Sequence, residues 1–293
     1  MKESKLFQIV LIFIILLISC KSEKPSKKVG DIIVAKNIDY AYLLSNRRAP
    51  FVKVRSDINK IFANSENLEK QYLDSIYKIY ESNRRKHEQV CRDFIREFPN
   101  SNTSAKTLNT FKTTWEKDTI LDLFKLLPKE SKETNLGKSI ARFIKISRNP
   151  QIGEKYVDFE QENITGKMIK LSDVKAKYIL VEFWASWCGP CRQANTTLLN
   201  NYKKYRDKGF EILGVSLDEN KEMWLNAVKV DKLIWENVSD LKGSENEARL
   251  IYKVNGIPDN ILINEKGIII GRKLRGNSLE KKLEELFGEK ASL

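Results

Sequence analysis

Two cysteines separated by a glycine and a proline are the residues of this sequence best suited to chemistry. Cys188 and Cys191 follow the apolar run Ile179–Trp184, and Gly189 and Pro190 stand between them. This spacing puts two thiols one helical turn apart, where a strand is expected to lead into a helix. Because a helix N-terminus stabilises a thiolate, we expect Cys188 to be reactive and Cys191 to lie shielded one turn further in.

The alternatives for this pair are a structural disulfide and half of a zinc site. A zinc site takes about four nitrogen, sulfur or oxygen ligands, and the other candidates are Cys20, Cys91 and the single histidine, His87. We interpret Cys91 as a small buried apolar residue of a helix. His87 stands between Lys86 and Glu88, which indicates a solvated helix face. We therefore predict a redox-active pair, with no metal and no other cofactor.

The region around the pair alternates between strand and helix patterns, which predicts an α/β fold. Short strand-like segments are expected at Tyr156–Phe159 and Lys167–Leu171, joined by a hairpin turn at Asn163–Gly166. The later elements are expected in this order: a strand over Ile179–Ala185, a helix from Pro190 to Gly209, a strand over Phe210–Leu217, a helix capped by Asp218 that contains Met223 and Trp224, a helix over Glu245–Tyr252, strands over Asn260–Asn264 and Ile268–Arg272, and a helix over Ser278–Phe287.

The preceding region has a different period. From about Asp57 to Lys145 apolar residues recur at spacings of three and four, which indicates amphipathic helices. Gly30–Val34 and Phe51–Val54 are candidate short strands. The length suits two domains, so we predict a mostly α-helical N-terminal domain over residues 29–150 and an α/β domain over residues 151–293.

The C-terminal region resembles the thioredoxin fold, and within it the TlpA/ResA-like thiol-disulfide oxidoreductases of bacterial cell envelopes. The resemblance covers about residues 151–293. It is carried by the run Phe183–Arg192, the segment Leu213–Asp218, the pair Ile257–Pro258 and the early hairpin. It implies a central mixed sheet flanked by helices, and a cycle in which one cysteine attacks a substrate disulfide and the other resolves the mixed disulfide.

The resemblance also assigns roles to single residues. Glu182 matches a buried acid; burial raises the pKa of a carboxyl group, which suits it to exchange a proton with Cys191. An exposed glutamate at a sheet edge is the alternative. Pro258 matches a cis-proline that faces the disulfide, and the backbone of Ile257 would pair with a substrate strand. The expected substrate-binding residues are Trp187, Gly189, Pro190, Ile257 and Pro258.

The N-terminus predicts export. An uncharged apolar run, Leu6–Ile18, follows two lysines and is shorter than the roughly 20 residues of a membrane-spanning helix. Leu17–Cys20 resembles a lipobox, so we predict a signal peptide over residues 1–20, lipidation of Cys20 and a tether over residues 21–28. An uncleaved signal anchor is the alternative. Both place the protein in the cell envelope, tethered to membrane lipid and facing the periplasm.

The predicted function is therefore a cell-envelope thiol-disulfide oxidoreductase, acting as a reductase on disulfide-containing exported proteins and receiving electrons from a membrane thiol donor. The net charge of +13 is interpreted as a lysine-rich surface close to anionic lipid, not as a nucleic-acid site. Two alternatives remain. One is a peroxidase of the peroxiredoxin type, which favours threonine where this chain has Ala185. The other is a binding or scaffold lipoprotein with a vestigial cysteine pair.

Overall fold

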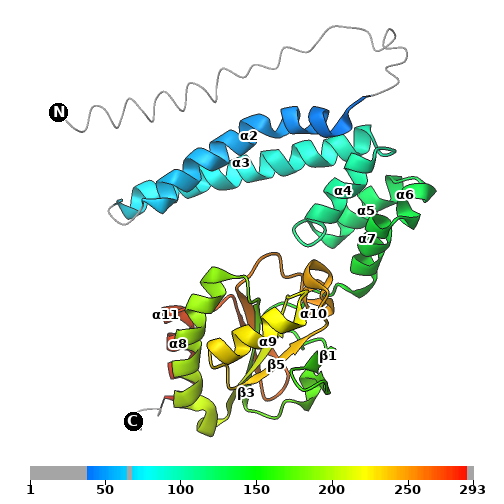
Figure 1. Ribbon diagram of the computed structural model, residues 1–293. Coiled ribbons are helices and arrows are strands. Elements are labelled where there is room, and N and C mark those ends of the chain that lie inside the picture. Colours follow the sequence, from blue (N-terminus) through cyan, green and yellow to red (C-terminus); the bar gives the residue numbers. More distant parts are fainter. Residues whose placement is uncertain (1–37, 65–67, 289–293) are drawn as a thin grey trace, which may run out of the picture. The chain divides into compact units, whose positions relative to one another are not determined.

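The computed structural model describes residues 38–64 and 68–288 (Figure 1). Cys20, the predicted tether and the candidate strand Gly30–Val34 lie outside these ranges. The chain divides into two units, Met1–Tyr40 and Ala41–Leu293. All elements named below, apart from the first residue of the first helix, belong to the second unit.

The region before residue 150 is helical, as predicted. Its elements are α2 (Tyr40–Ala63), α3 (Lys70–Glu97), α4 (Asn102–Phe111), α5 (Lys117–Leu126), α6 (Lys129–Glu133) and α7 (Asn135–Ile146). Serine and threonine side chains cap two of them: the Ser101 hydroxyl accepts the Ser104 N–H ahead of α4, and the Thr134 hydroxyl accepts the Gly137 N–H ahead of α7. Such caps satisfy amide groups that the first turn of a helix leaves unpaired.

The expectation of a strand at Phe51–Val54 is wrong, because these residues lie inside α2. Two valines in four residues favoured a strand by propensity alone. The longer pattern decides the structure: Leu44 and Ile58 are buried and stand two helical turns on either side of Phe51. Contacts with α3 hold this face in place, since the Asn83 amide donates to the Phe51 carbonyl and Arg47 pairs with Glu97.

The remaining elements form one seven-stranded mixed sheet in the order β2-β1-β5-β4-β3-β6-β7. The strands are β1 (Glu160–Asn163), β2 (Met168–Lys170), β3 (Tyr178–Trp184), β4 (Phe210–Ser216), β5 (Glu236–Ser239), β6 (Asp259–Asn264) and β7 (Ile269–Arg272). The helices are α8 (Gly189–Tyr205), α9 (Lys221–Val230), α10 (Glu247–Ile251) and α11 (Asn277–Phe287), with short 3-10 turns η2 (Leu171–Asp173), η3 (Arg206–Lys208) and η4 (Gly243–Glu245). Helices α8, α9 and α11 lie alongside the sheet (Figure 1).

Strand β3 is central and ends at the cysteine pair. It pairs in parallel with β4 and antiparallel with β6. Leu180, Val181, Phe183 and Trp184 are almost completely buried, as expected for a strand covered on both faces. The sheet and its flanking helices give the predicted thioredoxin-like fold.

Two polar strands depart from the sequence-based prediction. The first strand was expected at Tyr156–Phe159, but β1 begins at Glu160. Strand β5, with the sequence Glu-Asn-Val-Ser, was not predicted at all. Apolar periodicity cannot reveal such strands, because ladder hydrogen bonds with neighbouring strands order them. The predicted hairpin turn is present: Asn163 Oδ1 accepts the N–H groups of Thr165 and Lys167.

No helix in residues 38–64 or 68–288 has the length and apolarity that a membrane crossing requires.

Candidate active site

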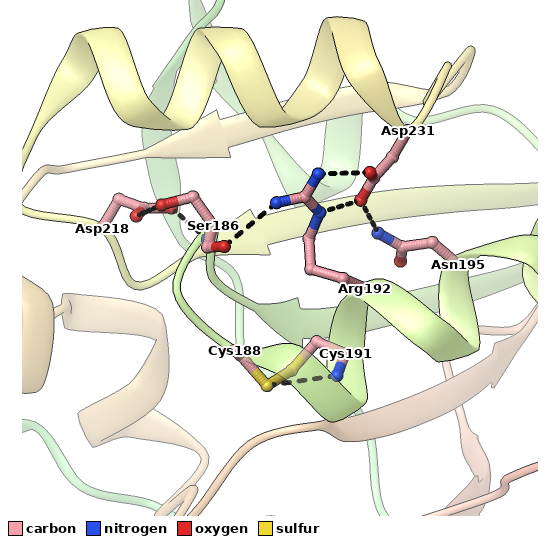
Figure 2. Close-up of a disulfide and its surroundings, with 7 residues drawn as sticks. All are labelled: Ser186, Cys188, Cys191, Arg192, Asn195, Asp218 and Asp231. Carbon is pink, nitrogen blue, oxygen red and sulfur yellow. Dashed lines mark hydrogen bonds and ion pairs between the residues drawn. A yellow bond between two sulfur atoms is a disulfide. The ribbon is translucent and has the colours of Figure 1, made fainter.

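The loop after β3 places the two cysteines at the first turn of α8. Cys188 is the N-cap of the helix, and its Sγ accepts the N–H of Cys191 at 3.2 Å (Figure 2). The two residues form a disulfide. Pro190 stands in the first turn, where its missing N–H removes no helical hydrogen bond. The residue exposures are 6% for Cys188, 1% for Cys191 and 62% for Trp187. Cys188 is thus the more accessible sulfur, and the large apolar surface beside it is open to solvent.

A buried carboxylate fixes the loop that leads to Cys188. Asp218, which follows β4, accepts hydrogen bonds from both the backbone N–H and the hydroxyl of Ser186 and from the Ser216 hydroxyl. Asp218 was expected to cap the next helix; this is wrong, because the Asn220 side chain accepts the Met223 N–H there. Asp218 instead serves the loop at Ser186, because the backbone N–H of Ser186 has no partner in a neighbouring strand and donates to the Asp218 carboxylate.

A second group of side chains fixes the first turn of α8 from the other side. Arg192 donates through two nitrogens to the Asp231 carboxylate and through a third to the Ser186 carbonyl (Figure 2). The Asn195 amide also donates to Asp231, at 2.8 Å. The prediction from sequence missed this group, because the residues come from helix α8 and the turn after α9, 36 to 39 positions apart. Together with Asp218, they hold the cysteine turn rigidly.

Glu182 is buried in β3, as predicted. Its register partner in β6 is Asn260, whose amide donates to Glu182 Oε2 at 2.9 Å. Burial raises the pKa of Glu182 to about 8, and the hydrogen bond from Asn260 and the positive charge of Arg275 only partly oppose this. Near neutral pH the carboxyl can therefore hold or release a proton.

The segment before β6 forms one wall of a pocket beside the cysteine turn. The Ile257–Pro258 peptide bond is cis, and Asp259 pairs with Phe183 at the end of β3. A pocket of about 740 Å³ is lined by Trp187, Ile257 and the exposed side chain of Met223, among others. Residues that are 70 positions apart in the chain thus face one cavity next to the disulfide.

Two glycines, Gly189 and Gly256, lie next to this pocket with open space beside their backbone. A side chain added at Gly189 or at Gly256 would meet nothing within 4 Å. The backbone is therefore accessible both between the cysteines and just before Ile257. A peptide can approach closely there.

Two further candidates from the sequence have different outcomes. Cys91 is a free, fully buried cysteine, as predicted, and burial raises the pKa of its thiol to about 11. The expectation that His87 is solvated is wrong: the residue is 7% exposed and accepts a hydrogen bond from Arg48. The charged neighbours Lys86 and Glu88 suggested an exposed face, but α2 and α4 cover this face of α3, and Glu88 is buried as well. Within the described ranges no three His, Cys, Asp or Glu residues are grouped to hold a metal ion.

Comparisons with known proteins find relatives of the C-terminal half of the chain. The AhpC/TSA family profile matches residues 152–272. The thiol-disulfide oxidoreductase ResA of Bacillus thuringiensis subsp. konkukian (strain 97-27) is 32% identical over 135 residues, 46% of this chain and 76% of that protein. ResA of Bacillus subtilis (strain 168) is 32% identical over 113 residues, 39% of this chain and 62% of that protein. A solved C-terminal domain of a Bacteroides thetaiotaomicron thiol-disulfide oxidoreductase is 38% identical, with a TM-score of 0.46, covering 48% of this chain and 99% of that one.

A cysteine pair at the first turn of a helix, in a thioredoxin-like sheet, defines the class of thiol-disulfide oxidoreductases, enzymes that work through a redox-active disulfide without a metal. The chain belongs to the family of ResA thiol-disulfide oxidoreductases. The resemblance to ResA-like thiol-disulfide oxidoreductases is thus confirmed.

Proposed function

We propose that the protein is a cell-envelope reductase of disulfides in exported proteins, with Cys188 as the attacking and Cys191 as the resolving cysteine. The observation that carries the proposal is the N-cap position of Cys188, whose sulfur accepts the Cys191 N–H. In the reduced enzyme the same amide and the helix dipole stabilise a thiolate at Cys188. Cys191 lies deeper, where a bulky substrate cannot reach it.

The proposed cycle consists of two thiol-disulfide exchanges. The Cys188 thiolate attacks one sulfur of a substrate disulfide, which forms a mixed disulfide and releases the other substrate sulfur as a thiolate. Cys191 then loses its proton and attacks Cys188, which releases the second substrate thiolate and leaves the Cys188–Cys191 disulfide. The substrate gains two electrons and the enzyme loses two. A membrane thiol donor returns them.

Glu182 is proposed to take the proton from Cys191 in the second exchange. A carboxyl group whose pKa is about 8 is close to the ordinary pKa of a thiol, so the transfer is nearly balanced in free energy. The side-chain amide of Asn260 donates a hydrogen bond to the Glu182 carboxyl, which fixes the orientation of that carboxyl.

The substrate is proposed to bind in the pocket lined by Trp187 and Ile257. The backbone of Ile257 and the cis-Pro258 turn would pair with an extended substrate segment. Gly189 and Pro190 form the accessible surface between the cysteines, where a side chain at Gly189 would point into open space. The exposed indole of Trp187 gives an apolar contact for residues next to the substrate cysteine.

Three parts of the proposal rest on the sequence: the reducing direction, from the Gly-Pro dipeptide between the cysteines; the extracytoplasmic location; and the lipid anchor at Cys20. Residues 1–20 would be the signal peptide, and residues 21–28 the tether between lipid and folded protein. A lipoprotein signal peptidase inhibitor should make an uncleaved precursor accumulate, and mass spectrometry should find lipid on Cys20. A normal-sized protein under the inhibitor, or an unmodified Cys20, would contradict the anchor.

Trapping of partners tests the exchange itself. A Cys191→Ser variant cannot resolve the mixed disulfide, so we expect it to accumulate covalent adducts with exported proteins that dithiothreitol releases. The matched control is Cys188→Ser, which keeps the deeper cysteine and should trap nothing. Adducts on Cys188→Ser, or none on Cys191→Ser, would contradict the assignment. A reduction potential of the couple near those of strong oxidants would contradict the reducing direction.

The match to the AhpC/TSA profile makes peroxide reduction a second candidate. The residue three positions before Cys188 is the buried Ala185, which offers no hydroxyl to hold a peroxide. Mixing the reduced enzyme with hydrogen peroxide separates the two candidates. Rapid stoichiometric consumption favours the peroxidase, whereas rates similar to those of free thiols favour disulfide exchange.

A further inference from the structure

The helical region contains a pocket of its own, with a volume of about 280 Å³. Helices α2, α3 and α4 all contribute to its lining. The residues that matter chemically are three arginines, one histidine and two phenylalanines: Arg48, Arg55, Arg84, His87, Phe51 and Phe111. The volume is just below the usual range of ligand pockets, about 300 to 1,000 Å³. Any ligand is therefore small.

The lining carries an excess of positive charge. Arg84 is neutralised by Glu81 and Glu88 on its own helix. Arg48 instead donates through Nε to His87 Nε2 at 2.8 Å, and in the described ranges neither Arg48 nor Arg55 forms an ion pair with a carboxylate. Two guanidinium groups thus meet at one pocket without an anionic partner. An anion would complete this arrangement, since a guanidinium binds carboxylate or phosphate oxygens through parallel hydrogen bonds.

The other walls are aromatic. The His87 ring lies between Phe51 and Phe111, with centroid distances of 6.3 Å and 6.2 Å. Tyr80 closes a further side. Such walls favour a planar apolar group, which would lose contact with water as it enters. A fully hydrated inorganic ion gains nothing from them.

We propose that this pocket binds a small organic anion with an aromatic body, its head group on Arg48 and Arg55 and its ring against Phe51 and Phe111. This site is separate from the cysteine chemistry and does not depend on it. It gives the helical region a binding role of its own.

The state of His87 is consistent with this assignment and provides a readout. Burial first, then the charges of Arg48 and Arg55, lower the pKa of His87 to about 4. The charged groups facing it are these two arginines on α2 and Arg84 and Glu88 on α3, while Thr110 and Phe111 of α4 carry no charge. A bound anion opposes the arginine charges, so it must raise the pKa of His87.

Titration followed by NMR tests the proposal. His87 is the only histidine of the sequence, so the histidine ring proton signal can be assigned to it directly. Benzenesulfonate and phenyl phosphate, which share the anion-plus-ring chemistry and keep a negative charge at pH 4, should each shift this signal saturably and raise the pKa of His87 by about one unit. Benzyl alcohol, which lacks the charge, and inorganic phosphate, which lacks the ring, should bind at least about tenfold more weakly.

Two variants locate the effect. Arg55→Gln removes a guanidinium whose residue is exposed, so it should fold normally and weaken benzenesulfonate binding by about tenfold. Lys53→Gln on the same helix changes the charge equally but lies outside this pocket, and should leave binding unchanged. Equal losses in both variants, an equal response to inorganic phosphate, or no saturable shift with either aromatic anion would overturn the proposal. None of these measurements uses the cysteine pair, so the result is independent of the proposed function.

Discussion

Near neutral pH the buried carboxyl of Glu182 is mostly protonated, because its pKa in the folded protein is about 8. In the unfolded chain a glutamate titrates at about 4.3. The folded state therefore binds the proton more tightly. The resulting stabilisation is complete below about pH 4 and is lost as the pH rises towards 8. Above that pH an uncompensated carboxylate is buried.

This predicts a pH-dependent difference between the wild type and Glu182→Gln. The amide keeps the hydrogen bond from Asn260 but does not titrate. From pH 5 to pH 8.5 the wild type should lose roughly 2 to 4 kcal/mol of unfolding free energy relative to the variant. Urea unfolding at both pH values measures this, with the exposed Glu160→Gln as the control. Parallel pH curves for the wild type and Glu182→Gln would show that the carboxyl has an ordinary pKa.

The same substitution tests the catalytic role of Glu182. Without a proton acceptor, resolution of the mixed disulfide by Cys191 should slow by about 100-fold at pH 8, where about half of the wild-type carboxyl is ionised and can take the proton. Alkylation of Cys188 in the reduced enzyme should keep its rate, because the Cys188 thiolate depends on the helix N-terminus. Rapid-quench measurement of a preformed mixed disulfide separates the two steps. An equal slowing of both would indicate a structural effect.

The sequence reveals some of these residues and conceals others. The cysteine pair and Glu182 stand out because each breaks a local pattern: a close pair of thiols, and an acid in an apolar run. Pro258 is singled out only by the resemblance to the thioredoxin fold. The pairing of Arg192 with Asp231 joins positions 39 residues apart, and both are ordinary surface-type residues. Their roles exist only in the folded structure.

At the scale of elements, the position of α8 depends on the loop that follows β3. Asp218 reaches this loop from the end of β4 and is almost completely buried. It accepts from the partly buried Ser186 and the fully buried Ser216, and these donating groups have no other partner among the described residues. The parallel β3–β4 pairing brings these two strand ends together.

Removal of this acceptor should affect both stability and exchange. Asp218→Ala leaves the donors of Ser186 and Ser216 unsatisfied, so we expect a loss of about 2 to 4 kcal/mol in unfolding free energy. The cysteine turn should also lose order, so attack by Cys188 on a peptide disulfide should slow. Chemical denaturation and stopped-flow exchange measure the two effects. Asp207→Asn, whose side chain is 94% exposed, should change neither; a similar change there would contradict the argument.

The strands and helices differ in how far the sequence specifies them. Strand β3 and helix α8 were predicted closely, because a buried apolar run and a Cys-Gly-Pro-Cys helix start are strong local signals. The polar strands β1 and β5 and the short helix α6 have no apolar pattern. In helix α2 the two valines favour a strand locally, but the contacts with α3 determine a helix.

At the scale of the whole unit Ala41–Leu293, the helical region is joined to the segment η4–α10 by buried polar contacts. The Lys112 ammonium at the end of α4 donates to Asn109, to Ser139 of α7 and to Glu245 of η4. Arg142 of α7 donates to the Glu245 carbonyl and pairs with Glu247. The Lys112 side chain is only 4% exposed, so this charge depends on its partners.

This segment and the residues just after it line the pocket beside the cysteines. Arg249, whose guanidinium donates to the Ser244 carbonyl, and Asn255, which accepts from Thr114, are both pocket residues. The helical region therefore supports one wall of this pocket. This relation was not visible in the sequence, where charged residues such as Lys112 and Glu245 indicate only a solvated surface.

Loss of the Lys112 charge should loosen this connection. Lys112→Met removes the donor but leaves Glu245 a third exposed, so water can solvate the freed carboxylate, and the expected loss is about 1 to 3 kcal/mol in unfolding free energy. Amide hydrogen exchange should accelerate in α7 and α10 and stay unchanged in β3 and β4, because the central sheet keeps its own core. Lys106→Met, an exposed change on α4, is the matched control. Exchange rates in α7 and α10 that equal those of the control would mean that Lys112 does not connect the two regions.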